Sequence, residues 1–336
     1  DEKKKMHITI FTDAWEPQIN GVVTTLRTTI DHLQRLGHRV EIVHPAMFKV
    51  TVPLQPSTGI FMPLLPMGLC EEFVFKADKI HIATEGSIGL AARHYCKKYK
   101  KDYTTSFHTK YPEYLHEHAY IPPRITGRYF RWFHRNSHCV MVPTPAMVDY
   151  CHEMGIKRVK IWSRGVDTNL FKPDPSFVRR GDAIRAIYVG RVSMEKNLEA
   201  FLEINNPNIV KYVIGDGPQL TEYSDRYPDT MFFGRKNADE IARILQTQDV
   251  FAWPSMTDTF GLVVLEAMAS GLPVAGFDNE VNRHIIEDGK SGILVDAYHL
   301  EHAIKSAALL KKEDAVATAK KFSWEEATKQ FVKNLV

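Results

Sequence analysis

Short apolar runs rich in β-branched residues alternate with longer segments of helical period along most of the chain. This alternation is typical of βαβ units, in which helices connect parallel strands and cover the sheet. In the first half it predicts strands at 7–11, 39–43, 79–83, 103–107 and 139–142, and helices at 22–36, 87–100, 123–136 and 145–154. In the second half it predicts strands at 184–189, 209–214, 230–233, 249–252 and 273–276, and helices at 196–203, 238–246, 261–270 and 298–311. The pattern therefore predicts an α/β protein with two doubly wound, Rossmann-like domains.

A segment with two prolines and little periodicity separates the two halves. We expect a first domain at 6–165, a linker at 166–182, a second domain at 183–320 and a final helical segment at 321–336. Trp324 and Phe331 in that last segment need a partner surface, and we expect the helix to pack back on the first domain. Two such domains are expected to face each other across a cleft, with the carboxyl ends of their strands toward a ligand. Residues 1–5 do not enter this prediction.

The composition is that of a globular protein, with 44% hydrophobic and 25% charged residues in a chain of 336. These values exclude a disordered or fibrous chain. No apolar run is long enough for a spanning helix, and nothing resembles a signal peptide. The cysteines are widely spaced and form no CxxC pair: Cys70, Cys96, Cys139 and Cys151. We expect reduced thiols in a cytoplasmic protein.

The net charge of +3 hides an asymmetry, since residues 1–165 carry +8 and the rest carries −5. A basic first half suggests that this half meets an anionic surface or substrate. No signature of an RRM, helix-turn-helix or zinc finger accompanies it, so we expect no nucleic-acid partner.

The first predicted strand is followed by Asp13 and then by Asn20-Gly21 at the start of a helix. A strand, a turn and a helix N-terminus can together offer backbone N–H groups to a phosphate. The alternative is an ordinary turn that uses Gly21 for a positive φ.

Basic residues and glycines follow two strands of the second half. Gly190, Arg191 and Lys196 come directly after the strand at 184–189, where a diphosphate would meet a guanidinium and an ammonium group. Gly215 and Gly217 follow the strand at 209–214 and would let the backbone approach a ligand. The alternative is a solvated basic loop.

Two carboxylates flank the start of a strongly apolar helix. Asp258 precedes it, Gly261 opens it, and Glu266 interrupts its apolar run LVVLEAMA. A buried carboxylate is costly unless it is hydrogen-bonded, and a ribose diol would supply two donors. A purely structural Glu266 is the alternative.

These segments together resemble a known family. GRVSMEKN (190–197), IGDGP (214–218) and SMTDTFGLVVLEAMASG (255–271) resemble the nucleotide-sugar half of glycosyltransferase family 4, whose members are retaining enzymes with the GT-B fold. FTDAWEPQINGV, HIATEGSIGLAAR, TSFHTKYPEY and SRGVDTNLFKP in the first half resemble its glycolipid-forming branch, which includes mannosyl- and sulfoquinovosyl-transferases.

The resemblance implies roles for individual residues. Arg191 and Lys196 would bind the donor diphosphate, Glu266 the ribose and Asp258 the sugar hydroxyls. Gly21 would close over the diphosphate, His108 would lie beside the transferred sugar, and Asp13 is a candidate for orienting the acceptor. Further donor contacts are expected at Asn20, Gly190, Gly215, Gly217, Arg235, Thr259, Phe260, Gly261 and Leu262, with Trp253 and Arg235 near the base. The family usually has Glu where this chain has Asp258, a departure that bears on sugar identity.

The resemblance implies transfer of a hexose, with retention, from a nucleoside diphosphate sugar of the GDP-mannose or UDP-glucose type to a hydroxyl acceptor such as diacylglycerol. No DxD or HExxH motif is present, so neither a metal nor another cofactor is expected. The histidines that could suggest a metal site are expected at the surface: His116, His118, His134 and His138. A GT-B-fold sugar-nucleotide epimerase and a non-catalytic nucleotide-sugar binding protein are the alternatives.

One predicted helix combines basic and aromatic residues, as an anionic membrane surface would require. Its candidate contacts are Arg124, Arg128, Arg131, Trp132 and Arg135. Residues 60–69 would form an apolar, proline-broken loop nearby, and the protein would be cytoplasmic and peripheral at the inner face of the membrane. In the alternative, the aromatic residues belong to the core and the arginines are merely solvated.

Overall fold

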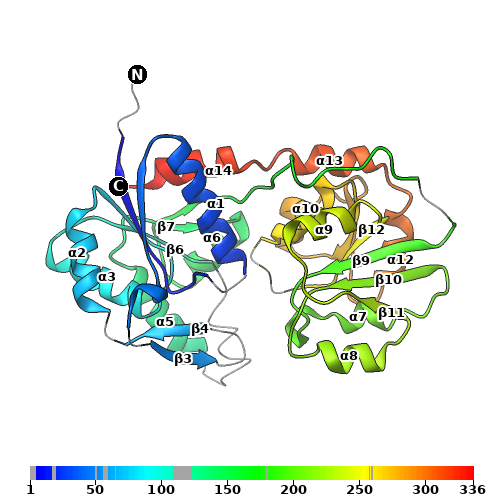
Figure 1. The fold of residues 1–336 in the computed structure, drawn as a ribbon, viewed down its shortest axis with the longest axis horizontal. Helices are drawn as coiled ribbons and strands as arrows, with labels where there is room; N and C mark the ends of the chain where they lie inside the picture. The colour runs from blue at the N-terminus through cyan, green and yellow to red at the C-terminus, as the bar shows by residue number, and fades with distance from the viewer. Residues whose placement is uncertain are drawn as a thin grey trace. The chain divides into compact units, whose positions relative to one another are not determined.

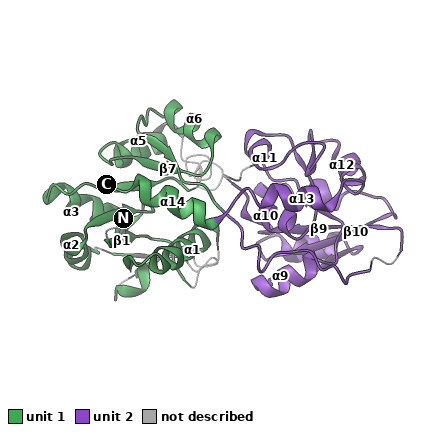
Figure 2. Cartoon of the chain, turned by 90° about the horizontal axis from the view of Figure 1, so that it is seen from above, with its two compact units in different colours: residues 1–164, 324–336 green, residues 165–323 purple. Residues whose placement is uncertain are grey.

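The computed structural model describes residues 5–16, 20–49, 51–55, 60–64, 66–108, 123–178, 181–256, 258 and 260–336 (Figure 1). The chain divides into two compact units (Figure 2). Unit 1 comprises Asp1–Arg164 and Trp324–Val336, and unit 2 comprises Gly165–Ser323. Residues 166–182, where a linker is predicted, are thus grouped with unit 2, and Phe171 among them is buried. Within the described ranges no helix has both the length and the apolar character needed to cross a membrane.

Unit 1 is built on a parallel sheet with the strand order β2-β1-β5-β6-β7-β8. Its strands are β1 (His7–Phe11), β2 (Arg39–Val43), β5 (Lys79–Ile82), β6 (Thr104–Ser106), β7 (Val140–Val142) and β8 (Val159–Ile161). Its helices are α1 (Gly21–Arg35), α2 (Met67–Lys76), α3 (Ser87–Lys98), α5 (Pro123–His134), α6 (Pro145–Glu153) and α14 (Trp324–Asn334), with the short η1 (Pro45–Met47). The five predicted strands are confirmed. The edge strand β8 was not predicted, because it is only partly buried and its central residue, Lys160, is exposed, so it does not form an apolar run.

The core of unit 1 lies on both faces of the sheet. Ile8 and Ile10 point to one face with Leu26 of α1, while Phe11 and Ile82 pack with residues of α3 on the other. Strands buried on both faces read as nearly continuous apolar runs, which is why β1 and β5 were found from the sequence. All four cysteines are buried and unpaired, as expected.

Residues 60–69 do not form the expected apolar loop. Ile60–Pro63 is strand β4, which pairs antiparallel with β3 (Thr51–Gln55), and helix α2 begins at Met67. Pro66 precedes the helix, where its missing N–H costs nothing, so the prolines mark element boundaries and not an extended loop.

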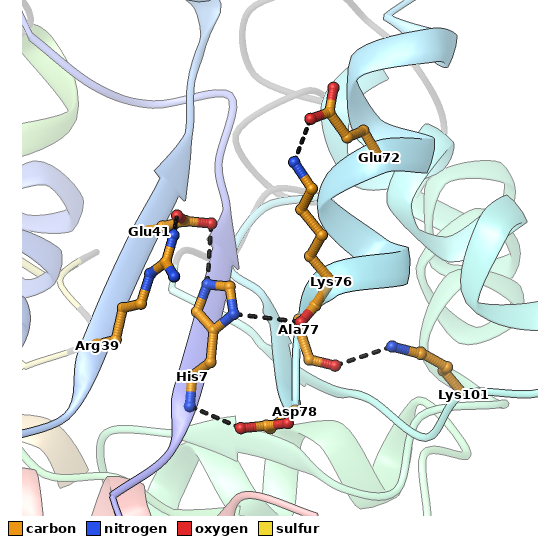
Figure 3. Close-up of polar contacts among 8 residues, drawn as sticks. All are labelled: His7, Arg39, Glu41, Glu72, Lys76, Ala77, Asp78 and Lys101. Carbon is orange, nitrogen blue, oxygen red and sulfur yellow. Dashed lines mark hydrogen bonds and ion pairs between the residues drawn. The ribbon is translucent and has the colours of Figure 1, made fainter.

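A cluster of polar contacts connects the amino ends of β1 and β2 with the end of α2 (Figure 3). His7 Nε2 lies 2.9 Å from Glu41 Oε2, and Arg39 donates to the other carboxylate oxygen at 2.6 Å. The His7 backbone N–H donates to Asp78, and Lys101 Nζ donates to the Ala77 carbonyl at 2.8 Å. These bonds join β1, β2 and the end of α2 at the amino ends of the strands. The loops that follow the strands lie at the opposite, carboxyl ends.

Unit 2 repeats the plan with the order β11-β10-β9-β12-β13-β14, again all parallel. Its strands are β9 (Ile184–Val189), β10 (Ile209–Ile214), β11 (Thr230–Phe232), β12 (Val250–Trp253), β13 (Val274–Phe277) and β14 (Gly292–Val295). Its helices are α7 (Glu199–Leu202), α8 (Leu220–Arg226), α9 (Ala238–Leu245), α10 (Leu262–Ala269), α11 (Glu280–Ile285), α12 (Leu300–Ala307) and α13 (Lys312–Ala319), with the short η3 (Met194–Lys196). The parallel six-stranded sheet of unit 2 thus matches the expected Rossmann-like arrangement.

Two predicted helices of unit 2 are wrong in extent. The helix expected at 196–203 is η3 followed by α7, because Asn197 between them takes the left-handed conformation at φ 55°. The helix expected at 298–311 ends at Ala307, and a separate helix, α13, follows. The short elements β14, α8 and α11 were also missed.

Helix α14 packs on unit 1 although it ends the chain, as expected (Figure 2). The Phe331 ring lies 4.7 Å from the Trp162 ring and 4.9 Å from the His81 ring, centroid to centroid. Asn334 Nδ2 donates to the Ile161 carbonyl at 2.9 Å, so the helix also satisfies the end of edge strand β8. The C-terminal helix is therefore an integral part of the first unit's core.

We expect Phe331→Ala to lower the free energy of unfolding by about 3–5 kcal/mol, because it leaves a cavity among fully buried rings. Phe331→Leu keeps most of the volume and should cost less than half as much. Urea unfolding followed by tryptophan fluorescence measures both. Equal stability of the two variants and the unaltered protein would show that α14 does not stabilise unit 1.

Candidate functional site

The loops after β9 and β10 lie in direct backbone contact at the carboxyl edge of the unit 2 sheet. A Cβ atom at Gly215, whose φ is +145°, would lie 1.7 Å from the Gly190 carbonyl oxygen. A Cβ atom at Gly217 would lie 2.2 Å from the carbonyl oxygen of Val192. Only glycine fits at these positions, so the predicted glycine turns bring the two loops together.

The loop after β11 joins the same edge. The Gly215 N–H donates to the Gly234 carbonyl at 2.9 Å, which places the exposed Arg235 on a neighbouring loop. Trp253, in contrast, does not reach this surface. It is 3% exposed and its ring stacks on Tyr188 at 5.7 Å, so the ring belongs to the core of unit 2, and its proximity to a base stays a prediction.

An ion pair joins two of the predicted site residues. Lys196 Nζ donates to Asp258 Oδ1 at 2.8 Å, and the Ser255 hydroxyl donates to the other carboxylate oxygen. Both partners are mostly buried, with side-chain exposures of 18% and 23%. Arg191 is more exposed, and its Nε lies 4.0 Å from Glu195. Lys196 is thus held in an ion pair with Asp258, whereas Arg191 is largely exposed and lies near Glu195.

Glu266 is the carboxylate within helix α10. Gly261 supplies the left-handed turn (φ +79°) before this helix, and Leu265 and Ala267 on either side of Glu266 are fully buried. Burial raises the pKa of Glu266 to about 8. Among the described residues no donor or cation contacts this carboxylate, so it is available to hydroxyl groups of a ligand.

The residues between these two carboxylates have different surroundings. Phe260 is 3% exposed, and its ring lies 5.8 Å from that of Phe322, so its side chain belongs to the core. Leu262 is the first residue of α10 and is partly buried. Thr259 lies outside the described residues.

Asp13 in unit 1 caps a helix. Its carboxylate accepts hydrogen bonds from the backbone N–H groups of Ile88 at 2.8 Å and Gly89 at 3.3 Å, and from the Thr84 hydroxyl at 2.8 Å. Burial raises the pKa of Asp13, although these hydrogen bonds oppose the shift. A Cβ atom at Gly86 would meet this carboxylate at 2.4 Å, so that position also requires glycine. The carboxylate is thus occupied by the N-terminus of α3.

Asn20 caps helix α1 in the same way. Its Oδ1 accepts from the N–H groups of Val22 and Val23 at 3.0 and 3.1 Å. Gly21 is the first residue of that helix, so the alternative in which it supplies a positive φ is wrong. A phosphate at this helix end would have to share these N–H groups with the Asn20 side chain.

His108 follows β6 and is 8% exposed. Arg164 Nη2 lies 3.1 Å from its Nδ1, and Ser106 Oγ lies 2.8 Å from its Nε2. Because a guanidinium can only donate, Nδ1 must be the acceptor and Nε2 must carry the proton. Burial, and then the charge of Arg164, lower the pKa of His108 well below its usual value. The ring is therefore neutral, with both nitrogens bonded within the protein.

A second buried pair lies close by and was missed from the sequence. His134 Nε2 contacts Glu85 Oε1 at 3.1 Å, and its Nδ1 contacts the Thr105 hydroxyl at 2.8 Å. His134 is 2% exposed, so the expectation of a surface histidine is wrong. His138 is exposed, and His116 and His118 lie outside the described residues. Burial raises the pKa of Glu85 even though His134 opposes the shift. The sequence places Glu85 in the loop after β5, but this place alone does not indicate its contact with His134.

Helix α5 divides its aromatic residues between core and surface. Phe130 and Phe133 are 4% and 0% exposed, as in the core alternative, whereas Trp132 is 39% exposed with the Arg93 guanidinium 4.0 Å from its ring centroid. The exposed side of the helix also carries Ile125, Arg128 and Arg131, and the exposed Arg135 directly follows the helix. Arg124 lies in the first turn of this helix. The surface keeps both a basic and an apolar component.

No group of three or more His, Cys, Asp or Glu side chains in the described part of the chain is arranged to hold a metal ion. The ligand-facing groups at the carboxyl edge of unit 2 are instead an ammonium, a guanidinium and two carboxylates, which suit an anion and hydroxyl groups.

Two family models match the chain, one to each half. The model described as Glycosyltransferase Family 4 matches residues 19–170, and the model described as Glycosyl transferases group 1 matches residues 174–330.

Similar proteins cover nearly the whole chain. A GDP-mannose-dependent alpha-mannosyltransferase of Mycobacterium tuberculosis is 27% identical over 90% of this chain and 87% of its own. An alpha-monoglucosyldiacylglycerol synthase of Acholeplasma laidlawii is 27% identical over 98% of this chain and 94% of its own. The solved structure of a sucrose-phosphate synthase from Thermosynechococcus elongatus has a TM-score of 0.78 at 18% identity, covering 98% of both chains.

We expect Asp13→Asn to lower the free energy of unfolding by about 1–2 kcal/mol, because an amide group replaces an oxygen that accepts from the α3 N-terminus. The exposed Asp31→Asn is the matched control and should leave stability unchanged. Urea unfolding measures both variants. Unchanged stability of Asp13→Asn would contradict the capping role.

We expect Glu266 to contribute a loss of stability to the free protein as the pH rises from about 5 to 9, because it holds its proton up to a pKa of about 8 in the folded state. Since the unfolded carboxyl loses its proton near its ordinary pKa, the folded state binds more protons across this range. Glu266→Gln removes this contribution. The free energy of unfolding of the variant, relative to that of the unaltered protein, should therefore rise with pH by on the order of a few kcal/mol.

Denaturant unfolding at pH 6 and pH 9 measures this effect, with the exposed Glu222→Gln as control. An identical pH dependence for Glu266→Gln and the unaltered protein would refute the burial of this acid.

Proposed function

The chain belongs to glycosyltransferase family 4, and from this premise we propose that it transfers a hexose, with retention of configuration, from a nucleoside diphosphate sugar to the hydroxyl group of a membrane glycolipid precursor. It is a glycosyltransferase that uses a sugar-nucleotide donor; the kind of sugar, the lipid acceptor and the stereochemistry are the proposal. The donor belongs to the GDP-mannose or UDP-glucose type, and diacylglycerol is the acceptor of first choice.

The ion pair between Lys196 and Asp258 is the observation that carries the proposal. A diphosphate that binds Lys196 must compete with Asp258 for the ammonium group. The freed carboxylate then lies beside the donor and can accept hydrogen bonds from sugar hydroxyls. Arg191, which is held only weakly by Glu195, can turn toward the same diphosphate.

Glu266 supports binding of a ribose at the same edge. A partly buried carboxylate that no donor contacts among the described residues is unfavourable, and two ribose hydroxyls would remove this penalty. Because its pKa is about 8, it is protonated in the free protein near neutral pH and would lose that proton when the ribose binds. Donor binding should therefore release a proton below pH 8.

In the proposed reaction the acceptor oxygen attacks the anomeric carbon while the bond to the diphosphate breaks on the same face. The acceptor hydroxyl proton passes to the departing phosphate oxygen, so no carboxylate nucleophile is required. Arg191 and Lys196 stabilise the charge that develops on the leaving diphosphate, with no metal ion in this role. The occupation of Asp13 by helix α3 supports a mechanism without it as a nucleophile.

We propose a positioning role for His108, because Ser106 and Arg164 engage both of its ring nitrogens. It shapes the end of β6, and its neutral ring takes no part in proton transfer. Asn20 and Gly21, at the start of α1, would contact the diphosphate through backbone N–H groups.

The acceptor is proposed from the relatives and from helix α5. One relative is named for the synthesis of a glycosylated diacylglycerol. The exposed side of α5, together with Arg135 directly after it, combines Trp132 and Ile125 with three arginines, which suits the interface of an anionic membrane. The epimerase and the non-catalytic binding protein are not favoured, because the relatives are transferases.

The proposal is tested by incubating the protein with GDP- and UDP-sugars, with and without vesicles that contain diacylglycerol, and identifying the products. A glycosylated diacylglycerol formed with an α linkage from an α-linked donor, also in the presence of a metal chelator, is the expected result. An inverted linkage would refute retention, and a product formed without consumption of an acceptor would refute transfer.

We expect Lys196→Ala to lower turnover by about a hundredfold or more, because the cation that stabilises the leaving diphosphate is lost. Lys305→Ala removes a lysine of another ion pair in unit 2 and should leave turnover unchanged. Initial rates at saturating donor measure both variants. Near-normal turnover of Lys196→Ala would contradict its assignment.

A further inference from the structure

A pocket of about 390 Å³ lies in unit 1, between helix α5 and the segment that precedes β8. Four of its lining residues are cationic: Arg131 from the helix, Arg135 directly after it, and Lys157 and Arg158 from the segment. The remaining lining residues are Val140, Ile156, Gly155 and His134, so no carboxylate lines the pocket. Its volume falls in the range of pockets that bind small molecules, roughly 300–1,000 Å³.

The four cations have no acidic partners among the described residues. Arg158 donates to the backbone carbonyl of Arg135 at 3.3 Å, and the Arg135 side chain donates to Asn136. The first contact accounts for Arg158 as a cap on the end of α5. This capping contact does not explain why Arg131 and Lys157 also line the pocket.

Gly155 lets the loop come close to the helix. Its φ is +83°, and a Cβ atom here would lie 3.2 Å from Cδ of Arg131. The loop therefore packs against the Arg131 side chain, which lines the pocket. The one histidine of the lining, His134, is held by Glu85 and Thr105 on its two ring nitrogens, so it adds shape to the pocket.

We infer that this pocket binds a phosphate-bearing ligand, whose phosphoryl group is held by Arg131, Arg135, Lys157 and Arg158. Like charges gathered without counter-ions repel one another, and a phosphate relieves that repulsion while it accepts several charge-assisted hydrogen bonds. The forked donors of arginine match phosphate oxygens in particular. The site lies in unit 1, contains none of the residues of the Lys196 site, and shares Arg131 and Arg135 with the surface proposed to face the membrane.

The phosphoryl group can belong to a soluble phosphate ester or to the headgroup of an anionic phospholipid, and both offer the same chemistry to the pocket. The apolar Ile125 and Trp132 lie exposed on helix α5, which supplies Arg131 and is followed directly by Arg135. The experiment therefore presents both sources to the same variants.

The test compares the full chain with Arg135→Gln/Lys157→Gln and with the control Arg35→Gln/Lys97→Gln, which removes two exposed cations of unit 1 outside the pocket. Calorimetry measures the binding of glycerol phosphate. Co-sedimentation measures the binding to vesicles of phosphatidylcholine with and without phosphatidylglycerol. Thermal unfolding verifies that the variants fold, and Lys157→Gln alone is the milder variant.

We expect the pocket variant to lose about tenfold or more in affinity relative to the control, with hydrogen-exchange protection at residues 155–158 when ligand binds. Loss of glycerol phosphate binding identifies a soluble ligand, and loss of binding to phosphatidylglycerol vesicles alone identifies a lipid headgroup. Equal binding by the pocket and control variants, or no binding of either probe by the unaltered chain, would overturn the inference.

Discussion

Parallel pairing of the strands is the constraint on which the rest of this structure depends. It directs the carboxyl ends of all strands of a sheet to one edge, where the following loops must meet. In unit 2 this edge collects the loops after β9, β10, β11 and β12, and with them Lys196 and Asp258. In unit 1 it collects Asp13, Glu85 and His108. Residues far apart in the sequence become neighbours because of this one rule.

The two edges use their polar groups differently. In unit 1 the carboxylate of Asp13 and the ring of His108 are satisfied within the protein, by the N-terminus of α3 and by Arg164. In unit 2 Glu266 has no donor among the described residues, and Lys196 is held by one exchangeable ion pair. The polar groups at the edge of unit 1 are therefore satisfied within the protein, whereas Glu266 at the edge of unit 2 is not satisfied by any described residue.

The sequence predicted the strands of both sheets well, because strands buried on both faces form continuous apolar runs. It missed β8 and β14, which are short edge strands, and it misjudged residues 60–69, where prolines stand at the ends of elements. It also missed Glu85 and misplaced His134. The burial of these two residues depends on contacts between α5 and the loop after β5, and no local pattern reports such contacts.

The most direct test of the account is hydrogen exchange of the full chain with and without a sugar nucleotide, over panels of GDP- and UDP-sugars. If unit 2 holds the donor as described, protection should appear in residues 190–197, 215–217 and 261–266 with one of these donors. Protection confined to other segments, or none with any donor in folded protein, would contradict the central claim that Lys196, Asp258 and Glu266 form the donor site.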